Sequence, residues 1–310
     1  MSLAFVFPGQ GSQAVRMLSG LAESNPLVNE TFTEANDALG FDLWALVQNG
    51  PEESLNQTTN TQPAMLAAGV AAWRVWRDMG GVAPAVMAGH SLGEYTALVC
   101  AGGLRFADAV KLVADRGRFM QEAVPAGEGA MAAIIGMDDD GVRSLCEQNA
   151  GGDVLSPVNF NSPGQVVIAG TAAAVQRAVD GAKEAGAKRA LVLPVSVPSH
   201  CRLMHDAAER MAERLASIEI QVPEIPVIHN FNVRVEQSPE AIKTALVSQV
   251  EQPVRWVETI QKMSADGVDK LVECGPGKVL VGLNKRIDKA METWAVYDAE
   301  TMAAALEGVK

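Results

Sequence analysis

The 310-residue chain has few cysteines, few aromatic residues and no long apolar run. Its richest apolar stretch, residues 64–76, is interrupted by Arg74 and is too short to cross a membrane. The N-terminus shows no basic segment followed by an apolar core of signal-peptide length. The cysteines form no C-x-x-C pair, which argues against a zinc site or a disulfide framework; they are Cys100, Cys146, Cys201 and Cys274. We therefore expect a cytoplasmic protein with reduced thiols, no metal, no resident cofactor and no membrane association.

Positive charge is also scarce, because 25 lysines and arginines face 37 acidic residues and give a net charge of −12. Nonspecific binding of nucleic acid needs a basic face, so this balance argues against it. An acidic protein partner would need a local basic patch on an acidic body. What the chain has instead is abundant alanine, valine and glycine, a composition that suits close packing of helices on strands.

Apolar periodicity alternates between strand and helix in the first part of the chain. This order predicts a parallel sheet covered by helices. The expected strands are residues 3–7 and 84–89, and the expected helices are residues 26–39, 62–79, 91–102 and 106–123.

The pattern changes after Val124-Pro125 and changes back after Pro198. Between them, residues 129–197 read as strand, helix, strand, helix and strand, which resembles a small ferredoxin-like unit. We expect an α/β fold in which a large α/β-hydrolase-like domain with a mainly parallel sheet carries this unit as an insertion. The expected boundaries are 1–124 with 198–310 for the large domain and 125–197 for the small one.

The stretch GHSLGEY (89–95) matches G-x-S-x-G, the pattern of a nucleophile on a sharp turn between a strand and a helix. An ordinary tight connection containing a serine is the alternative. A nucleophilic Ser91 needs a base, and four histidines are available. His90, His205 and His229 are expected to be structural, whereas His200 follows a predicted strand as Ser91 does, so it is the candidate base.

Three further features leave alternatives open. The predicted helices and strands place no aspartate between Ser91 and His200 in a clear post-strand loop, so the third member of a triad need not be a carboxylate. PGQGSQA (8–14) fits a dinucleotide fingerprint, but no second strand follows its helix; its glycines could instead let the backbone of Gln10 approach a neighbouring site. Arg116 interrupts an apolar helix, and an internal ion pair is a simpler explanation than a clamp for a substrate carboxylate.

Seven motifs occur in an order that resembles a known family over essentially the whole chain. They are FPGQGSQ (7–13), GHSLGEY (89–95), RGRFMQEA (116–123), NFNSPGQVVIAG (159–170), VSVPSH (195–200), QPVRW (252–256) and VECGPGKVLVGL (272–283). Together they resemble the malonyl-CoA:acyl carrier protein transacylases of bacterial type II fatty-acid synthesis.

The resemblance implies a role for each matching residue. Ser91 would be the acylated nucleophile, His200 its general base, and the backbone amides of Gln10 and Leu92 the oxyanion hole. Arg116 would bind the free carboxylate of a malonyl group. The remaining implied residues are Gln249, whose backbone carbonyl would orient the histidine, and Gln62 and Asn161 near the acyl pocket.

The resemblance also implies the reaction and its partners. A monomeric enzyme would move malonyl from malonyl-CoA to the phosphopantetheine thiol of holo acyl carrier protein, by a ping-pong mechanism. The carriers of this pathway are acidic, so Lys188 with Arg189 and Lys285 with Arg286 are candidate docking residues, or else solvated surface pairs. Two other functions would use some of the same residues. A serine esterase or thioesterase would need Ser91 and His200 but not Arg116. A catalytically silent carrier-binding module would not need Ser91, His200 and Arg116 together.

Overall fold

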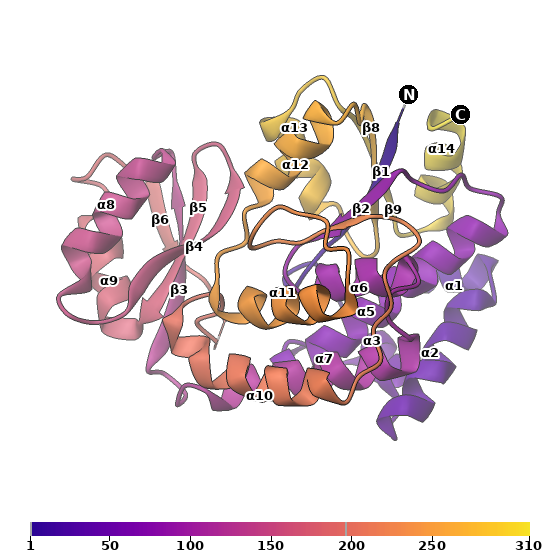
Figure 1. Cartoon of the computed structure of the whole chain (residues 1–310), viewed down its shortest axis with the longest axis horizontal. Coiled ribbons are helices and arrows are strands. Elements are labelled where there is room, and N and C mark those ends of the chain that lie inside the picture. The colour runs from indigo at the N-terminus through magenta and orange to yellow at the C-terminus, as the bar shows by residue number, and fades with distance from the viewer. Residues whose placement is uncertain (1, 196) are drawn as a thin grey trace.

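The computed structural model describes residues 2–195 and 197–310, so Ser196 of the VSVPSH motif lies outside the described residues. The chain forms two β-sheets, each with its own helices, that stand side by side (Figure 1). The expected α/β class, with a parallel sheet in one part of the molecule and a second sheet in the other, is confirmed. No helix among the described residues has the length and apolarity needed to span a membrane.

The first sheet is parallel, with five strands in the order β7-β2-β1-β8-β9. Its central strand β1 is buried along its whole length, as its unbroken apolar sequence LAFVF predicts. Phe7 at the end of β1 lies opposite Gly89 at the end of β2, so both strands deliver their following loops to the same edge. The bounds are β1 Leu3–Phe7, β2 Val86–Gly89, β7 Val227–Ile228, β8 Lys270–Cys274 and β9 Glu292–Val296.

Helices cover both faces of the first sheet and bury two apolar clusters against it. The long α5 begins at Thr58, four residues before the helix expected from periodicity, and β9, α1, α3, α4 and α14 were not anticipated. The helices of this part are α1 Ser19–Ser24, α2 Leu27–Leu39, α3 Leu43–Asn49, α4 Glu52–Leu55, α5 Thr58–Asp78, α6 Gly93–Cys100, α7 Phe106–Glu122, α10 His205–Ala216, α11 Pro239–Glu251, α12 Trp256–Ala265, α13 Val279–Ile287 and α14 Ala299–Gly308, with a 3₁₀ turn η1 at Arg202–Met204.

The second sheet is antiparallel, in the order β4-β5-β3-β6, and helices α8 and α9 pack on one of its faces. The sequence prediction missed β4, because Pro157 and the polar end of the strand leave only Val158 and Phe160 as an apolar alternation. The register of β4 also shifts twice against β5. With β4 included, the order becomes βαββαβ, the ferredoxin-like arrangement. The bounds are β3 Gly129–Ile135, α8 Asp139–Ala150, β4 Leu155–Ser162, β5 Gln165–Thr171, α9 Ala172–Gly181 and β6 Arg189–Val192.

The two parts meet through β4 and the segment that follows α11. The backbone of Val254 pairs with β4, accepting from the Phe160 N–H at 3.0 Å and donating to the Val158 carbonyl at 2.8 Å. The face of the second sheet that lacks helices packs toward Cys201, next to His200. One expectation fails here: β6 ends at Val192 rather than Val197, so His200 lies on a connection eight residues beyond its strand. That connection carries His200 from the second sheet to the first.

Candidate active site

Ser91 lies in the tight turn between β2 and α6, in the left-handed conformation with φ of 51°. The flanking glycines are required by close approach of backbone. A Cβ on Gly89 would lie 1.8 Å from the carbonyl carbon of Gly93, and one on Gly93 would lie 2.0 Å from the Phe7 carbonyl oxygen. The turn is therefore compressed against β1, and left-handed φ at a non-glycine residue is the strain expected of a nucleophile elbow.

The loop after β1 packs directly on this turn. A Cβ on Gly9 would come within 2.5 Å of the His90 carbonyl oxygen, so the glycine brings the two loops together. Gln10 and Leu92 line the same cavity as Ser91. Within the described part of the chain, their backbone N–H groups have no hydrogen-bond partner. Unpaired amides beside a serine hydroxyl are the donors that an oxyanion hole needs. The close approach at Gly9 also fits the interpretation of the PGQGSQ glycines that involves no dinucleotide.

His200 meets Ser91 across the cavity, with its Nε2 atom 2.7 Å from Ser91 Oγ. Its Nδ1 lies 2.7 Å from the backbone carbonyl oxygen of Gln249. A carbonyl can only accept, so the proton is on Nδ1 and the bare Nε2 accepts the Ser91 hydroxyl proton. The histidine is thereby held in the tautomer that a general base requires.

The carbonyls that hold His200 come from the end of α11. The last carbonyls of a helix have no partner within the helix, and here two of them bind one histidine. Gln249 accepts from the ring, and Val250 accepts from the His200 backbone N–H at 3.1 Å. The negative end of the helix dipole also favours a positive charge on the ring during proton transfer. This helix end takes the place that an aspartate has in a triad.

The imidazole of His200 is buried, and the guanidinium of Arg116 is nearby. Burial, with a smaller contribution from the Arg116 charge, lowers the pKa of His200 to about 3. Both effects disfavour the charged ring. His200 is therefore neutral at physiological pH, in the form that can accept a proton.

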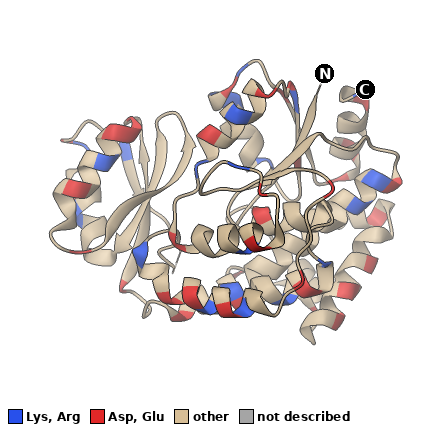
Figure 2. Cartoon of the chain, viewed as in Figure 1, with Lys and Arg blue, Asp and Glu red and all other residues tan. Residues whose placement is uncertain are grey.

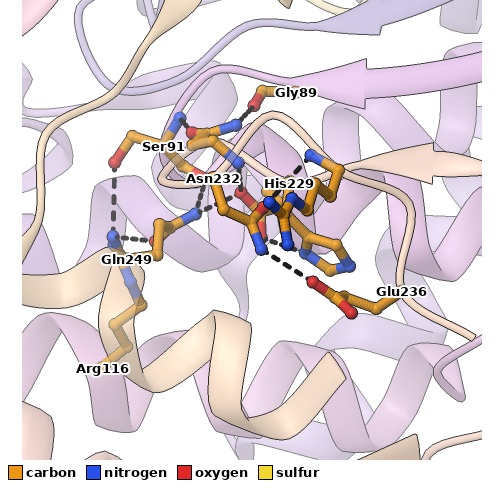
Figure 3. Close-up of polar contacts among 10 residues, drawn as sticks. Gly89, Ser91, Arg116, His229, Asn232, Glu236 and Gln249 are labelled. Carbon is orange, nitrogen blue, oxygen red and sulfur yellow. Dashed lines mark hydrogen bonds and ion pairs between the residues drawn. The ribbon is translucent and has the colours of Figure 1, made fainter. Parts of the chain in front are cut away.

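Arg116 projects from α7 into the site and is almost fully buried, at 1% exposure. Figure 3 shows its side chain directed at Ser91 and Gln249. The Nη2 atom of Arg116 donates to Ser91 Oγ at 3.2 Å and to Gln249 Oε1 at 3.0 Å. Its Nη1 atom donates to Gln62 Oε1 at 2.9 Å. The internal ion pair considered from the sequence is not found among the described residues, since these partners are uncharged.

Asn161 and the other histidines complete the placement of the predicted residues. Asn161 Oδ1 lies 2.8 Å from His90 Nε2, so it contacts the residue before the nucleophile from β4. His229 Nδ1 lies 2.7 Å from a carboxylate oxygen of Glu94. His205 begins α10 and is exposed beside Glu251, outside the cavity. The structure thus gathers Ser91, His200, Gln249, Gln10, Leu92, Arg116, Gln62 and Asn161 around one centre.

Sequence reasoning missed two buried residues that hold the turn. Asn230, just after β7, accepts from the Ser91 N–H at 2.7 Å and donates to the Gly89 carbonyl at 2.6 Å. Glu94 Oε2 accepts from the Asn230 N–H at 2.9 Å and from Gln249 Nε2 at 3.0 Å. A glutamate within the apolar start of a helix was the available signal for Glu94. No feature of the sequence around Asn230 indicates its role in the turn.

The cavity that these residues share has a volume of about 120 Å³ and lies between the two parts of the chain. The first part contributes Ser91 and Arg116, and His200 comes from the connection between the two sheets. The second contributes Met131 of β3 and Asn159 of β4, and the connection after β6 adds apolar walls. A small cavity in which a buried cation lies beside a hydroxyl and a neutral imidazole suits a short acyl group that carries a negative charge.

Comparison with known proteins agrees with this geometry. Residues 4–301 match the acyl transferase domain family. The chain is 60% identical to the malonyl CoA-acyl carrier protein transacylase of Escherichia coli (strain K12) over 304 residues, covering 98% of each, and 45% identical to that of Bacillus subtilis over 309 residues, covering 99% and 97%.

Solved structures give the same result. The chain superposes with a TM-score of 0.96 on an acyl carrier protein S-malonyltransferase from Vibrio cholerae, which is 60% identical and covered in full, as this chain is. It superposes with a TM-score of 0.98 on a malonyl-transacylase in complex with a type II PKS acyl-carrier protein, at 57% identity, covering 99% of this chain and 100% of the other.

Proposed function

Because the chain belongs to the malonyl CoA-acyl carrier protein transacylases of the acyl transferase family, we propose that the Ser91 cavity carries out malonyl transfer. The enzyme is an acyl-carrier-protein S-malonyltransferase of fatty-acid synthesis. The observation that supports the assignment of the site is the chain of contacts from the Gln249 carbonyl through His200 to Ser91, with Arg116 beside it. The expected cytoplasmic location and monomeric state remain predictions.

In the first half-reaction, His200 Nε2 accepts the Ser91 hydroxyl proton while Oγ attacks the thioester carbonyl carbon of malonyl-CoA. The carbonyl oxygen becomes an oxyanion that accepts hydrogen bonds from the Gln10 and Leu92 amides. Such donors contribute roughly 3–4 kcal/mol each in comparable sites. The C–S bond then breaks, and the CoA sulfur takes the proton from His200, leaving a malonyl ester on Ser91.

In the second half-reaction, the phosphopantetheine thiol of acyl carrier protein gives its proton to His200 and attacks the ester carbonyl. The C–O bond to Ser91 breaks, and Oγ recovers the proton from His200. Arg116 holds the malonyl carboxylate in both steps. An acyl group without a carboxylate would leave the buried guanidinium with only its neutral partners, which disfavours that substrate.

We assign carrier docking to one end of the second sheet. Arg189 of β6 pairs with Ile135 of β3, and Ile135 pairs with Gln165 of β5. Arg286 of α13 donates to Gln165 Oε1 at 2.8 Å. The strand register and the contact of Arg286 with Gln165 therefore bring both basic pairs, Lys188–Arg189 and Lys285–Arg286, to the same end of the sheet.

The distance from this end to the cavity suits a carrier arm. Leu193 lines the cavity four residues beyond Arg189, roughly 13 Å along an extended strand. Figure 2 shows Lys and Arg on α13, whereas α10 carries both signs. An acidic carrier would meet the basic pairs while its extended prosthetic arm reaches inward.

The test is a two-step labelling experiment. Wild-type protein and Ser91→Ala are incubated with malonyl-CoA or acetyl-CoA, analysed by intact mass, and then mixed with holo acyl carrier protein. We expect a malonyl adduct on wild-type protein only, little acetyl adduct, and transfer of malonyl to the carrier. Rapid release of free malonate would indicate a hydrolase, and absence of any adduct would indicate a non-catalytic carrier-binding protein.

A further inference from the structure

Gln249 uses two separate chemical groups in the site. Its backbone carbonyl accepts from His200 Nδ1, as described above. Its side-chain amide faces the other way: Oε1 accepts from Arg116 Nη2 at 3.0 Å, and Nε2 donates to the Ser91 carbonyl at 2.8 Å and to Glu94 Oε2 at 3.0 Å. The residue is fully buried. Because its two groups are separate, a substitution can remove the side-chain amide and keep the backbone carbonyl that contacts His200.

The guanidinium of Arg116 is buried among neutral oxygens. A buried cation is costly unless an opposite charge compensates it. Within the described residues, the carboxylate joined to it most directly is that of Glu94, and the Gln249 amide lies between the two. A carboxylate in direct contact with Arg116 would compete with any acid that the guanidinium is to bind.

Glu94 is itself fixed in place. Its carboxylate accepts from His229 Nδ1 at 2.7 Å and from the Asn230 N–H at 2.9 Å, in addition to Gln249. The side chain is fully buried, so its negative charge is poorly screened by water. A polarised amide between two buried, opposite charges is oriented by both, with its oxygen toward the cation and its nitrogen toward the anion.

We propose that the side-chain amide of Gln249 is a specificity-determining group: it aims Arg116 and links it to Glu94, and so leaves the guanidinium available for the substrate carboxylate. This inference rests on the proposed malonyl transfer at Ser91. Gln62 differs, because it holds the other side of Arg116 with its oxygen while its nitrogen faces the Met120 sulfur at 3.7 Å. Gln62 therefore supports the guanidinium without connecting it to a charge.

The test compares kcat/KM for malonyl-CoA with kcat/KM for acetyl-CoA, since acetyl uses the dyad but not the clamp. Gln249→Met keeps the backbone carbonyl and removes the amide. We expect the malonyl-to-acetyl ratio to fall by about tenfold or more. Gln62→Met should lower the ratio less, and Gln221→Met, a matched change at an exposed site, should leave it unchanged.

A double-mutant cycle with Arg116→Ala distinguishes this role from general support of the fold. In the Arg116→Ala background, Gln249→Met should change the ratio by less than about twofold, because the clamp is already absent. An equal effect in both backgrounds, or an unchanged ratio in Gln249→Met alone, would overturn the proposal. If wild-type protein forms no malonyl ester, the proposed function fails instead.

If Gln249→Met does not fold, Glu94→Gln tests the same link from its other end. Glu94→Gln still allows Arg116 to donate to the Gln249 side chain, but it removes the carboxylate charge on the other side of that amide. The malonyl-to-acetyl ratio should again fall in the wild-type background and stay constant in Arg116→Ala. A uniform loss for both substrates would show that Glu94 only supports the turn and would count against the proposal.

Discussion

Ser91 and His200, the proposed nucleophile and base, are held in opposite ways. Ser91 is fixed at both of its backbone polar groups by side chains from elsewhere: Asn230 accepts from its N–H and Gln249 donates to its carbonyl. His200 is fixed at its backbone N–H and its ring by main-chain carbonyls at the end of α11. Both residues have left-handed φ, 51° and 64°, so both conformations need external support.

This difference has a consequence for mutation. Support by side chains can be removed one residue at a time, whereas support by a helix end survives any substitution that leaves the helix in place. The nucleophile should therefore be sensitive to changes around it, and the base should be insensitive to them. Five expected effects are given below, from the largest to the smallest, and the comparison of Asn230→Ala with Val250→Ala tests this contrast directly.

Ser91→Ala and His200→Ala should each lower kcat/KM for malonyl transfer by about 10⁴-fold or more, because each removes half of one proton-transfer pair. The double variant should lose no more than the worse single variant. Steady-state kinetics with malonyl-CoA and holo carrier would check both statements. Losses that multiply in the double variant would mean that the two residues act independently, contrary to the 2.7 Å contact.

Arg116→Ala should lower kcat/KM for malonyl-CoA on the order of 10²- to 10³-fold, as expected for loss of a buried charged contact. Acylation by acetyl-CoA should change much less, since acetyl carries no carboxylate. Arg118→Ala provides a matched control, because Arg118 lies on the same helix and pairs with Asp115 at the surface. Equal losses for the two thioesters in Arg116→Ala would exclude a clamp.

Asn230→Ala should lower kcat/KM by about 10- to 100-fold, because it leaves the Ser91 N–H and the Gly89 carbonyl without their partner. The matched change on the base side is Val250→Ala, which shortens a buried side chain but keeps the carbonyl that holds His200. It should lower the melting temperature by several degrees and change kcat/KM less than about threefold. If Val250→Ala matches Asn230→Ala in lost activity, the contrast between the two supports is wrong.

Charge reversal at the proposed docking end should have a smaller effect. Lys285→Glu with Arg286→Glu should raise the KM for holo acyl carrier protein several-fold and leave acylation by malonyl-CoA unchanged. The effect should weaken as salt is added, because exposed charges are screened. Lys262→Glu on α12 is the control at another surface site. An unchanged carrier KM in the double reversal would place docking elsewhere.

The smallest expected change is in pH dependence. A base with a pKa of about 3 stays neutral between pH 5 and 8, so kcat/KM should show no histidine inflection near 6.5 in that range. Arg116→Ala removes a neighbouring positive charge and should raise the pKa of His200. Its acetyl-CoA profile should fall at a higher pH than that of the wild type as acid is added. An inflection near 6.5 in the wild-type protein would contradict the burial of the ring.

Most of the fold was accessible from periodicity. β1 was predicted residue for residue, and α2 and α7 were predicted to within a residue at each end. β4 was missed because Pro157 and the polar residues at its end confine its apolar alternation to Val158 and Phe160, which is too short to indicate a strand. β6 was predicted too long. Short elements such as α3 and α4 give too few residues to show a period.

The candidate site was accessible where its chemistry is local. Ser91 and its glycines lie within five consecutive residues, so the local sequence alone indicates a turn that needs small residues. The resemblance supplied Gln249 as an orienting carbonyl, a role that no side-chain pattern can indicate because every residue has a carbonyl. Asn230 and Glu94 were missed altogether, since their partners lie more than 130 residues away along the chain.

The sequence by itself determined the turn on which Ser91 stands, because both of its glycines lie within five consecutive residues. In the folded turn a Cβ on Gly89 would meet the Gly93 backbone, and a Cβ on Gly93 would meet the end of β1. It also placed a buried arginine on α7 without saying what that charge would meet. Only the tertiary structure decided that the end of α11 would hold His200, and that an amide would separate Arg116 from Glu94. Unpaired helix carbonyls and buried charges act through space, and the distances between them exist only once the two sheets have packed together.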